Sequence, residues 1–147
     1  MTFDGWSVID FPPPAGSLSQ APQACVYVFC WKTDKGPVPF YVGESGRLAK
    51  RICDDYRTKY FTAPTDFCVG EAAAHLISKG HQLVVFYRAS SDRRPDRRKE
   101  ERALIRSLQL EGRRLLNCFP RYCYQASVGR EQEERTAVLE FMNALVP

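Results

Sequence analysis

The 147-residue sequence has no run of apolar residues near the ~18 that a membrane-spanning helix needs, so we expect no membrane partner. Residues 1–17 lack the basic segment and apolar stretch of a secretory leader. None of the six cysteines forms a C-x-x-C pair, and a zinc site from Cys118, Cys123 and a histidine is disfavoured by its spacing. These absences predict reduced thiols and a cytoplasmic protein.

The composition is that of an ordinary globular domain. Hydrophobic residues make up 44% and charged residues 26%, which argues against a disordered or fibrous chain. Lys and Arg number 21 against 17 Asp and Glu, giving a net charge of +4. This mild positive charge permits a nucleic-acid partner, but a simple solubility margin would look the same.

The length predicts one domain, with an N-terminal arm over residues 1–23 and the domain over 24–147. Consecutive prolines at 12–14 cannot lie inside regular structure, which sets the arm apart. Side-chain patterns predict strands at 24–31, 38–43 and 82–88, and helices at 45–60, 66–79, 95–111 and 130–146. This irregular order of strands and helices favours an α+β fold over a doubly wound sheet.

An ordered set of short motifs runs through this domain. Tyr27 ends the run Cys25-Val26-Tyr27, and Tyr41 opens Tyr41-Val42-Gly43. The run from Gly43 to Arg51 (GESGRLAKR) fits G-x-[ST]-x-x-L-x-x-R, and Glu101 opens ERALI. With Asn117, this set resembles the signature of the GIY-YIG nucleases, over about residues 24–118.

The resemblance implies a three-stranded antiparallel sheet flanked by helices and metal-dependent hydrolysis of DNA phosphodiester bonds. It implies catalytic roles for Tyr27, Tyr41, Arg51, Glu101 and Asn117. Glu101 would hold the metal ion, Mg²⁺ or Mn²⁺, while Arg51 would bind the phosphate. One tyrosine would take a proton from the attacking water, and the other would orient the water or the phosphate; which does which stays open.

Each of these residues also has an ordinary structural interpretation. Glu101 shares the core-facing stripe of its predicted helix, where a carboxylate is costly unless it meets water or a cation, but acids in a first helical turn are also favoured by the helix dipole. Glu100 is its rival if the helix phase differs by one residue. Arg51 could pair with Asp54 or Asp55 on the surface, and strand tyrosines commonly pack in cores.

Two positions depart from the family pattern. Asn117 lies some four residues further from Glu101 than the family leads us to expect, and no proline precedes it. It would either fix the site by hydrogen bonding or simply end a turn. Four residues after Arg51, where relatives carry His or Tyr, stands Asp55, followed by Tyr56. We interpret Asp55 as a surface ion-pair partner and Tyr56 as a core residue.

Basic side chains lie beside both motif regions, and we expect them to neutralise phosphates without reading sequence. They are Arg47, Lys50, Arg93, Arg94, Arg97 and Arg98. Neighbouring acids could instead balance them in a solvated loop.

Two other functions stay open. A catalytically degenerate module of the same fold would bind nucleic acid or a protein, and a cysteine- or metal-dependent enzyme of another kind is a weaker alternative. A nuclease this small would take its target specificity from loops, from the 1–23 arm, from a homodimer or from a partner chain.

Overall fold

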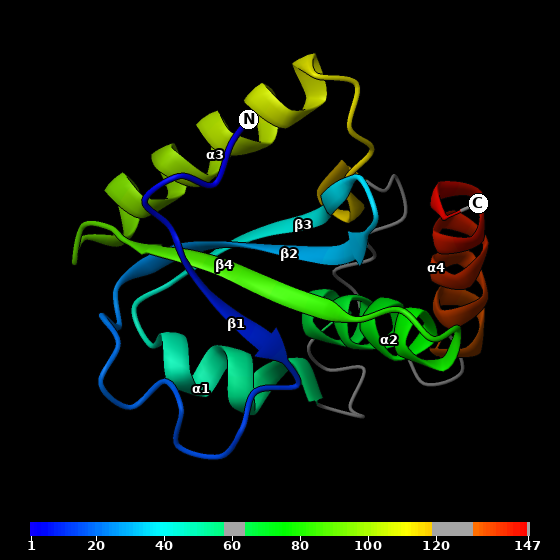
Figure 1. Cartoon of the computed structure of the whole chain (residues 1–147), viewed down its shortest axis with the longest axis horizontal. Coiled ribbons are helices and arrows are strands. Elements are labelled where there is room, and N and C mark those ends of the chain that lie inside the picture. The colour runs from blue at the N-terminus through cyan, green and yellow to red at the C-terminus, as the bar shows by residue number, and fades with distance from the viewer. Residues whose placement is uncertain (58–63, 119–130, 147) are drawn as a thin grey trace.

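A computed structural model describes residues 1–57, 64–118 and 131–146 of the chain. It is an α+β fold in which an antiparallel sheet lies between helices (Figure 1). The elements, in chain order, are β1 (Ser7–Phe11), β2 (Cys25–Thr33), β3 (Gly36–Ser45), α1 (Leu48–Cys53), the 3₁₀ turn η1 (Asp55–Arg57), α2 (Pro64–Ser78), β4 (Leu83–Ala89), α3 (Arg94–Leu110), the 3₁₀ turn η2 (Leu116–Cys118) and α4 (Glu131–Leu145).

The sheet has four strands in the order β1-β4-β2-β3, so the expected count of three is wrong by one. The additional strand, β1, comes from the N-terminal residues and pairs with β4 from Ser7↔Tyr87 to Phe11↔Leu83. Its five residues precede Pro12, which cannot donate to a ladder, and an edge position accommodates that.

Strand β2 lies inside the sheet, and its alternating side chains supply two cores. Tyr27 and Phe29 belong to the core under α1 and α2, whereas Val26 and Val28 belong to the core under α3. Figure 1 shows α3 on one side of the sheet, α1 and α2 on the other, and α4 beside α2. Both faces of β2 are therefore buried, which explains its nearly continuous run of apolar residues.

The helix expected over 45–60 is shorter. Helix α1 ends at Cys53, and Tyr56 lies in η1. Asp54 and Asp55 follow the last helical residue, and aspartate competes for the backbone hydrogen bonds of a helix. Leu48, Ile52 and Tyr56, which recur at four-residue spacing, are nevertheless all buried, and Tyr56 is the core residue that we expected.

Of the cysteines, Cys25, Cys30 and Cys68 are buried free thiols, and Cys118 is an exposed free thiol. Cys123, considered above for a zinc site, lies outside the described residues. Within the described part of the chain, no helix combines the length and the apolar character needed to cross a bilayer.

Candidate active site

Three buried tyrosines from different elements meet under the sheet. They are Tyr27 of β2, Tyr41 of β3 and Tyr56 of η1, none more than 6% exposed. The hydroxyls of Tyr27 and Tyr56 share a hydrogen bond of 2.5 Å, and the rings of Tyr41 and Tyr56 meet edge to face at 6.0 Å. The two motif tyrosines are thus linked through Tyr56.

Gly43 makes room for this cluster. Tyr27 lies opposite Gly43 in the β2–β3 pairing. A Cβ atom at position 43 would lie 2.4 Å from Cε2 of Tyr27 and 2.6 Å from its hydroxyl oxygen. The glycine of the Tyr41-Val42-Gly43 run is therefore required by the ring that faces it.

Arg51 reaches the same cluster from α1. Its guanidinium carbon lies 4.8 Å from the centre of the Tyr56 ring. Its Nη1 donates to a carboxylate oxygen of Asp66 at 2.8 Å and to Asp55 at 3.3 Å. Asp55 also accepts from Lys50, so its expected ion pairing is present. Arg51 is held by two acids and an aromatic ring, and its side chain is 26% exposed.

Glu101 approaches from the opposite side, on α3. The pKa of its carboxyl is raised to about 7, because burial and then the negative charge of Glu44 raise it more than nearby arginines, Arg51 among them, lower it. Glu101 also contributes to raising the pKa of Tyr41, so the two side chains are close enough to interact electrostatically. Among the described residues, Glu101 makes no hydrogen bond or ion pair.

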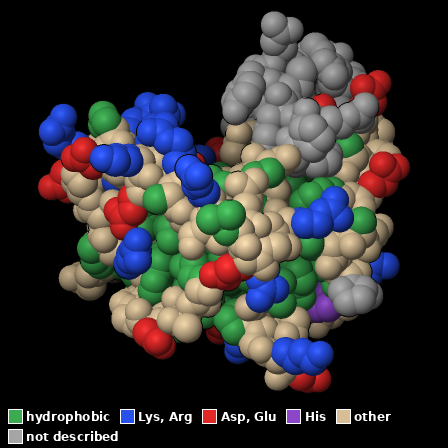
Figure 2. Space-filling view, turned by 90° about the horizontal axis from the view of Figure 1, so that it is seen from above, with side chains coloured by type: hydrophobic (Ala, Val, Ile, Leu, Met, Phe, Trp, Pro, Cys, Tyr) green, Lys and Arg blue, Asp and Glu red, His purple; other side chains and the backbone are tan. Residues whose placement is uncertain are grey.

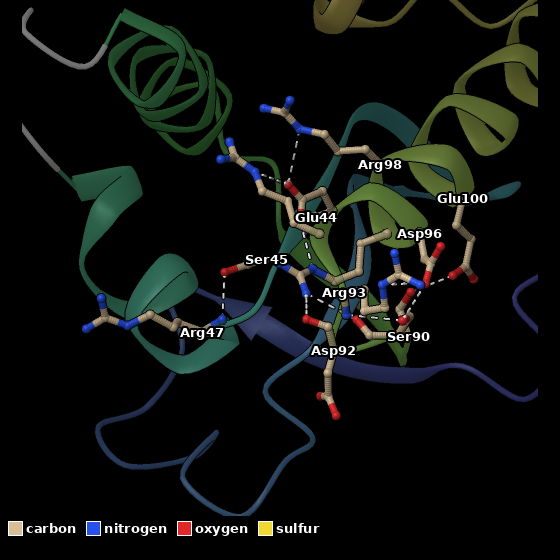
Figure 3. Close-up of polar contacts among 12 residues, drawn as sticks. Glu44, Ser45, Arg47, Ser90, Asp92, Arg93, Asp96, Arg98 and Glu100 are labelled. Atoms are coloured by element: carbon tan, nitrogen blue, oxygen red, sulfur yellow. Dashed lines mark hydrogen bonds and ion pairs between the residues drawn. The ribbon is translucent and has the colours of Figure 1, made fainter.

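Its neighbour Glu100 faces another way. The Glu100 carboxylate accepts from Arg88 at 2.8 Å and from the Ser90 hydroxyl at 2.5 Å. It points toward Ser90 and away from Glu44 (Figure 3). Leu104 and Leu108 are buried on the stripe that Glu101 begins. The two neighbouring glutamates therefore differ in surroundings: Glu100 pairs with Arg88 and Ser90, whereas Glu101 lies near Glu44 and Tyr41.

Asn117, in η2, completes the edge of β3. Its side-chain oxygen accepts from the backbone N–H of Val42 at 2.8 Å, and its side-chain nitrogen donates to the Val42 carbonyl at 2.7 Å. Val42 lies between Tyr41 and Gly43. Asn117 is therefore a hydrogen-bonding residue beside the motif strand, as one of the two interpretations of the sequence had it.

The basic residues divide into exposed and buried ones. Arg97 is buried, and it donates to Glu44 at 2.8 Å and to the carbonyls of Ser91 and Asp92. Arg94 and Arg98 are more than half exposed, with their Nε atoms 3.9 Å from the other oxygen of Glu44. Viewed from above, the face that carries α3 shows a gathering of Lys and Arg side chains (Figure 2).

The remaining basic positions are on the surface. Arg93 is 78% exposed and lies 4.0 Å from Asp96. Lys50 is 48% exposed, and Arg47 lies exposed just before α1, its backbone N–H bonded to Ser45 (Figure 3).

Sequence reasoning missed three residues of this site. Tyr56 was interpreted as core only, although its hydroxyl bonds that of Tyr27. Asp66 is separated from Arg51 by fourteen intervening residues and belongs to no motif, so nothing in the sequence signalled it. Glu44 sits inside the Gly43–Arg51 run, at a position where the pattern defines no residue type.

The electrostatics of the cluster constrain its chemistry. Burial raises the pKa of Tyr41 to about 12, and burial raises the pKa of Tyr27 well above its ordinary value. Both phenols are consequently protonated at neutral pH, and in the Tyr27–Tyr56 pair either hydroxyl can be the donor. No three His, Cys, Asp or Glu side chains gather as a metal-ligand group in the described part of the chain.

No protein-family model, curated protein or solved structure matches the chain. What the site does must therefore be argued from its own geometry.

Proposed function

We propose that the protein is a metal-dependent endonuclease that hydrolyses DNA phosphodiester bonds, as its resemblance to the GIY-YIG nucleases implies. One observation carries the proposal: Tyr27, Tyr41 and Arg51 come from three different elements and gather around Tyr56, while Glu101 on α3 approaches closely enough to interact electrostatically with Tyr41 and Arg51. Their separation in sequence makes this convergence a product of the fold.

The carboxylate of Glu101 fits a divalent cation. It is half-buried and makes no hydrogen bond or ion pair among the described residues, and burial and Glu44 destabilise its anion more than the nearby arginines stabilise it. A cation would offset both effects, and Mg²⁺ accepts a site with one protein carboxylate completed by waters and substrate phosphate. The ion, when bound, would supply positive charge against the phosphate that is cut.

Arg51 is suited to bind that phosphate. Its Nη1 donates to both Asp55 and Asp66, and the guanidinium also lies close enough to Tyr27 to oppose the rise that burial causes in the pKa of that phenol. The Nε–Nη2 edge of a guanidinium donates two parallel hydrogen bonds, a geometry that matches two phosphate oxygens. Charge that develops on the phosphoryl group would be stabilised there.

Tyr27 and Tyr41 enter as hydroxyl donors. Since their phenols are protonated at neutral pH, they would orient the attacking water and a phosphate oxygen. Either could accept a proton only if substrate binding brought positive charge near enough to lower its pKa. As the water oxygen bonds to phosphorus, the bond to the leaving sugar oxygen breaks, and the proton that the water loses would pass to that tyrosine and on to the leaving oxygen.

The exposed arginines of α3 would contact the DNA backbone. Arg94 and Arg98 are held near Glu44, and Arg47 and Lys50 flank the same end of β3. Each phosphate neutralised should make the slope of log affinity against log salt more negative by about 0.9. Arg97 is left out of this set because its guanidinium is buried and bonded within the protein.

The test is the cleavage of supercoiled plasmid in Mg²⁺ or Mn²⁺ against EDTA, with Glu101→Gln beside its matched neighbour Glu100→Gln. We expect the wild-type protein and Glu100→Gln to nick or linearise the plasmid only with metal, and Glu101→Gln to be inactive although folded. Normal cleavage by folded Glu101→Gln would refute the proposal.

A second function, a binding module without catalysis, is favoured by one observation. Arg51 already has two carboxylate partners, which compete with a phosphate for its charge. Salt-dependent DNA binding without hydrolysis in any divalent metal, on plasmid and branched DNA, would support this alternative.

A further inference from the structure

Helix α2 brings an acidic side chain to Arg51 that belongs to no motif. We propose that Asp66 is a positioning residue that fixes the orientation in which the Arg51 guanidinium would meet a phosphate. This inference rests on the proposed function, because it assigns Asp66 a role in the same site.

The contacts around Arg51 define one orientation of its guanidinium. Asp66 accepts from Nη1 at 2.8 Å, Asp55 accepts from the same nitrogen at 3.3 Å, and the Tyr56 ring lies against the guanidinium. Three contacts, two from η1 and one from α2, restrict a side chain that otherwise rotates about several bonds. The shorter of the two carboxylate contacts is the one from Asp66.

The face of α2 that carries Asp66 lies unusually close to the tyrosine cluster. Gly70 follows Asp66 by four residues, so both lie on one face of the helix. A Cβ atom at position 70 would lie 2.5 Å from the backbone carbonyl oxygen of Tyr56. The glycine thus permits the close approach that brings Asp66 within hydrogen-bonding distance of Arg51.

The cost of burying Asp66 argues for a role in geometry. Its side chain is 12% exposed, against 23% for Asp55. Burial raises the pKa of Asp66 even though Arg51 lowers it, so the ion pair does not fully offset the loss of solvent. A buried ion pair of this kind contributes little net stability, and it is consistent with a device that fixes orientation.

The experiment compares Asp66→Asn with Asp55→Asn, since each removes one carboxylate from the same Nη1. For plasmid cleavage we expect Asp66→Asn to lower kcat roughly 10- to 100-fold with little change in KM, because misplacing a group by an ångström costs about that much. Asp55→Asn should lose clearly less, and Asp66→Glu should recover part of the loss. The proposal would be overturned if folded Asp66→Asn had the same kcat as the wild-type protein. It would also be overturned if Asp66→Asn and Asp55→Asn lowered kcat equally.

A second measurement keeps this test separate from the proposed function. Thermal unfolding of Asp66→Asn, Arg51→Gln and the double variant forms a cycle that needs no activity. We expect the double variant to lose less Tm than the two single losses added together, since both remove one interaction. Strictly additive losses in Tm would show that Asp66 and Arg51 do not stabilise each other, and would overturn the proposal. If the wild-type protein cuts no DNA, the nuclease proposal fails and the cycle alone decides whether Asp66 holds Arg51.

Discussion

The substitution Gly43→Ala tests whether the Tyr27 ring requires a residue without a side chain at position 43. The added methyl would meet the Tyr27 ring at 2.4–2.6 Å, and Tyr27 is fully buried, so the ring cannot swing into solvent. Overpacking of a buried site costs about 1–3 kcal/mol. At about 2–4 °C per kcal/mol for a chain of this size, Tm should fall by about 2–12 °C.

The assay is thermal unfolding followed by circular dichroism, with the same substitution made in a Tyr27→Leu background. Leucine lacks the ring atoms that the new methyl meets, so Gly43→Ala should cost much less there. The reasoning is refuted if Gly43→Ala leaves Tm unchanged beside Tyr27, or if it costs as much beside leucine.

Three further predictions follow from individual contacts. The folded protein binds the Glu101 proton more tightly than the unfolded chain does. In EDTA the wild type should therefore lose stability relative to Glu101→Gln as pH rises from about 4.5 to about 7, as thermal unfolding across that range would show. Arg97→Ala breaks a buried ion pair and should cost about 3–5 kcal/mol in urea unfolding, whereas Arg93→Ala should cost under about 0.5. Asn117→Ala leaves both backbone groups of Val42 without a partner and should cost about 1–3 kcal/mol in the same assay, with reduced cleavage.

The spacing of apolar residues along the sequence predicted most of the fold, because it indicates which side chains are buried. The run from Val26 to Cys30 is apolar on both faces of β2, and the stripe of Leu48, Ile52 and Tyr56 is buried. Strand β1 escaped prediction because five residues with a partly exposed pattern carry little periodic signal. Its position as a strand is decided by pairing with β4, a long-range contact.

The candidate site was predictable only where a motif marks it. Tyr27, Tyr41, Arg51 and Glu101 were singled out from the sequence; in the structure the first three lie around Tyr56, and Glu101 approaches from α3. Asp66 was not, because an acid in the first turn of a helix has an ordinary explanation, and its contact with Arg51 depends on how α2 packs. The buried state of Arg97 was equally hidden, since a run of arginines in sequence does not show which one turns inward.

The most direct test of the central claim is the initial rate of supercoiled-plasmid nicking by wild-type protein and by Arg51→Ala, each in Mg²⁺, Mn²⁺ and EDTA. Circular dichroism would establish that the variant is folded. The account predicts nicking or linearisation by the wild-type protein in metal, its loss in EDTA, and its loss in Arg51→Ala. Cleavage by Arg51→Ala at the wild-type rate, or cleavage that persists in EDTA, would contradict it.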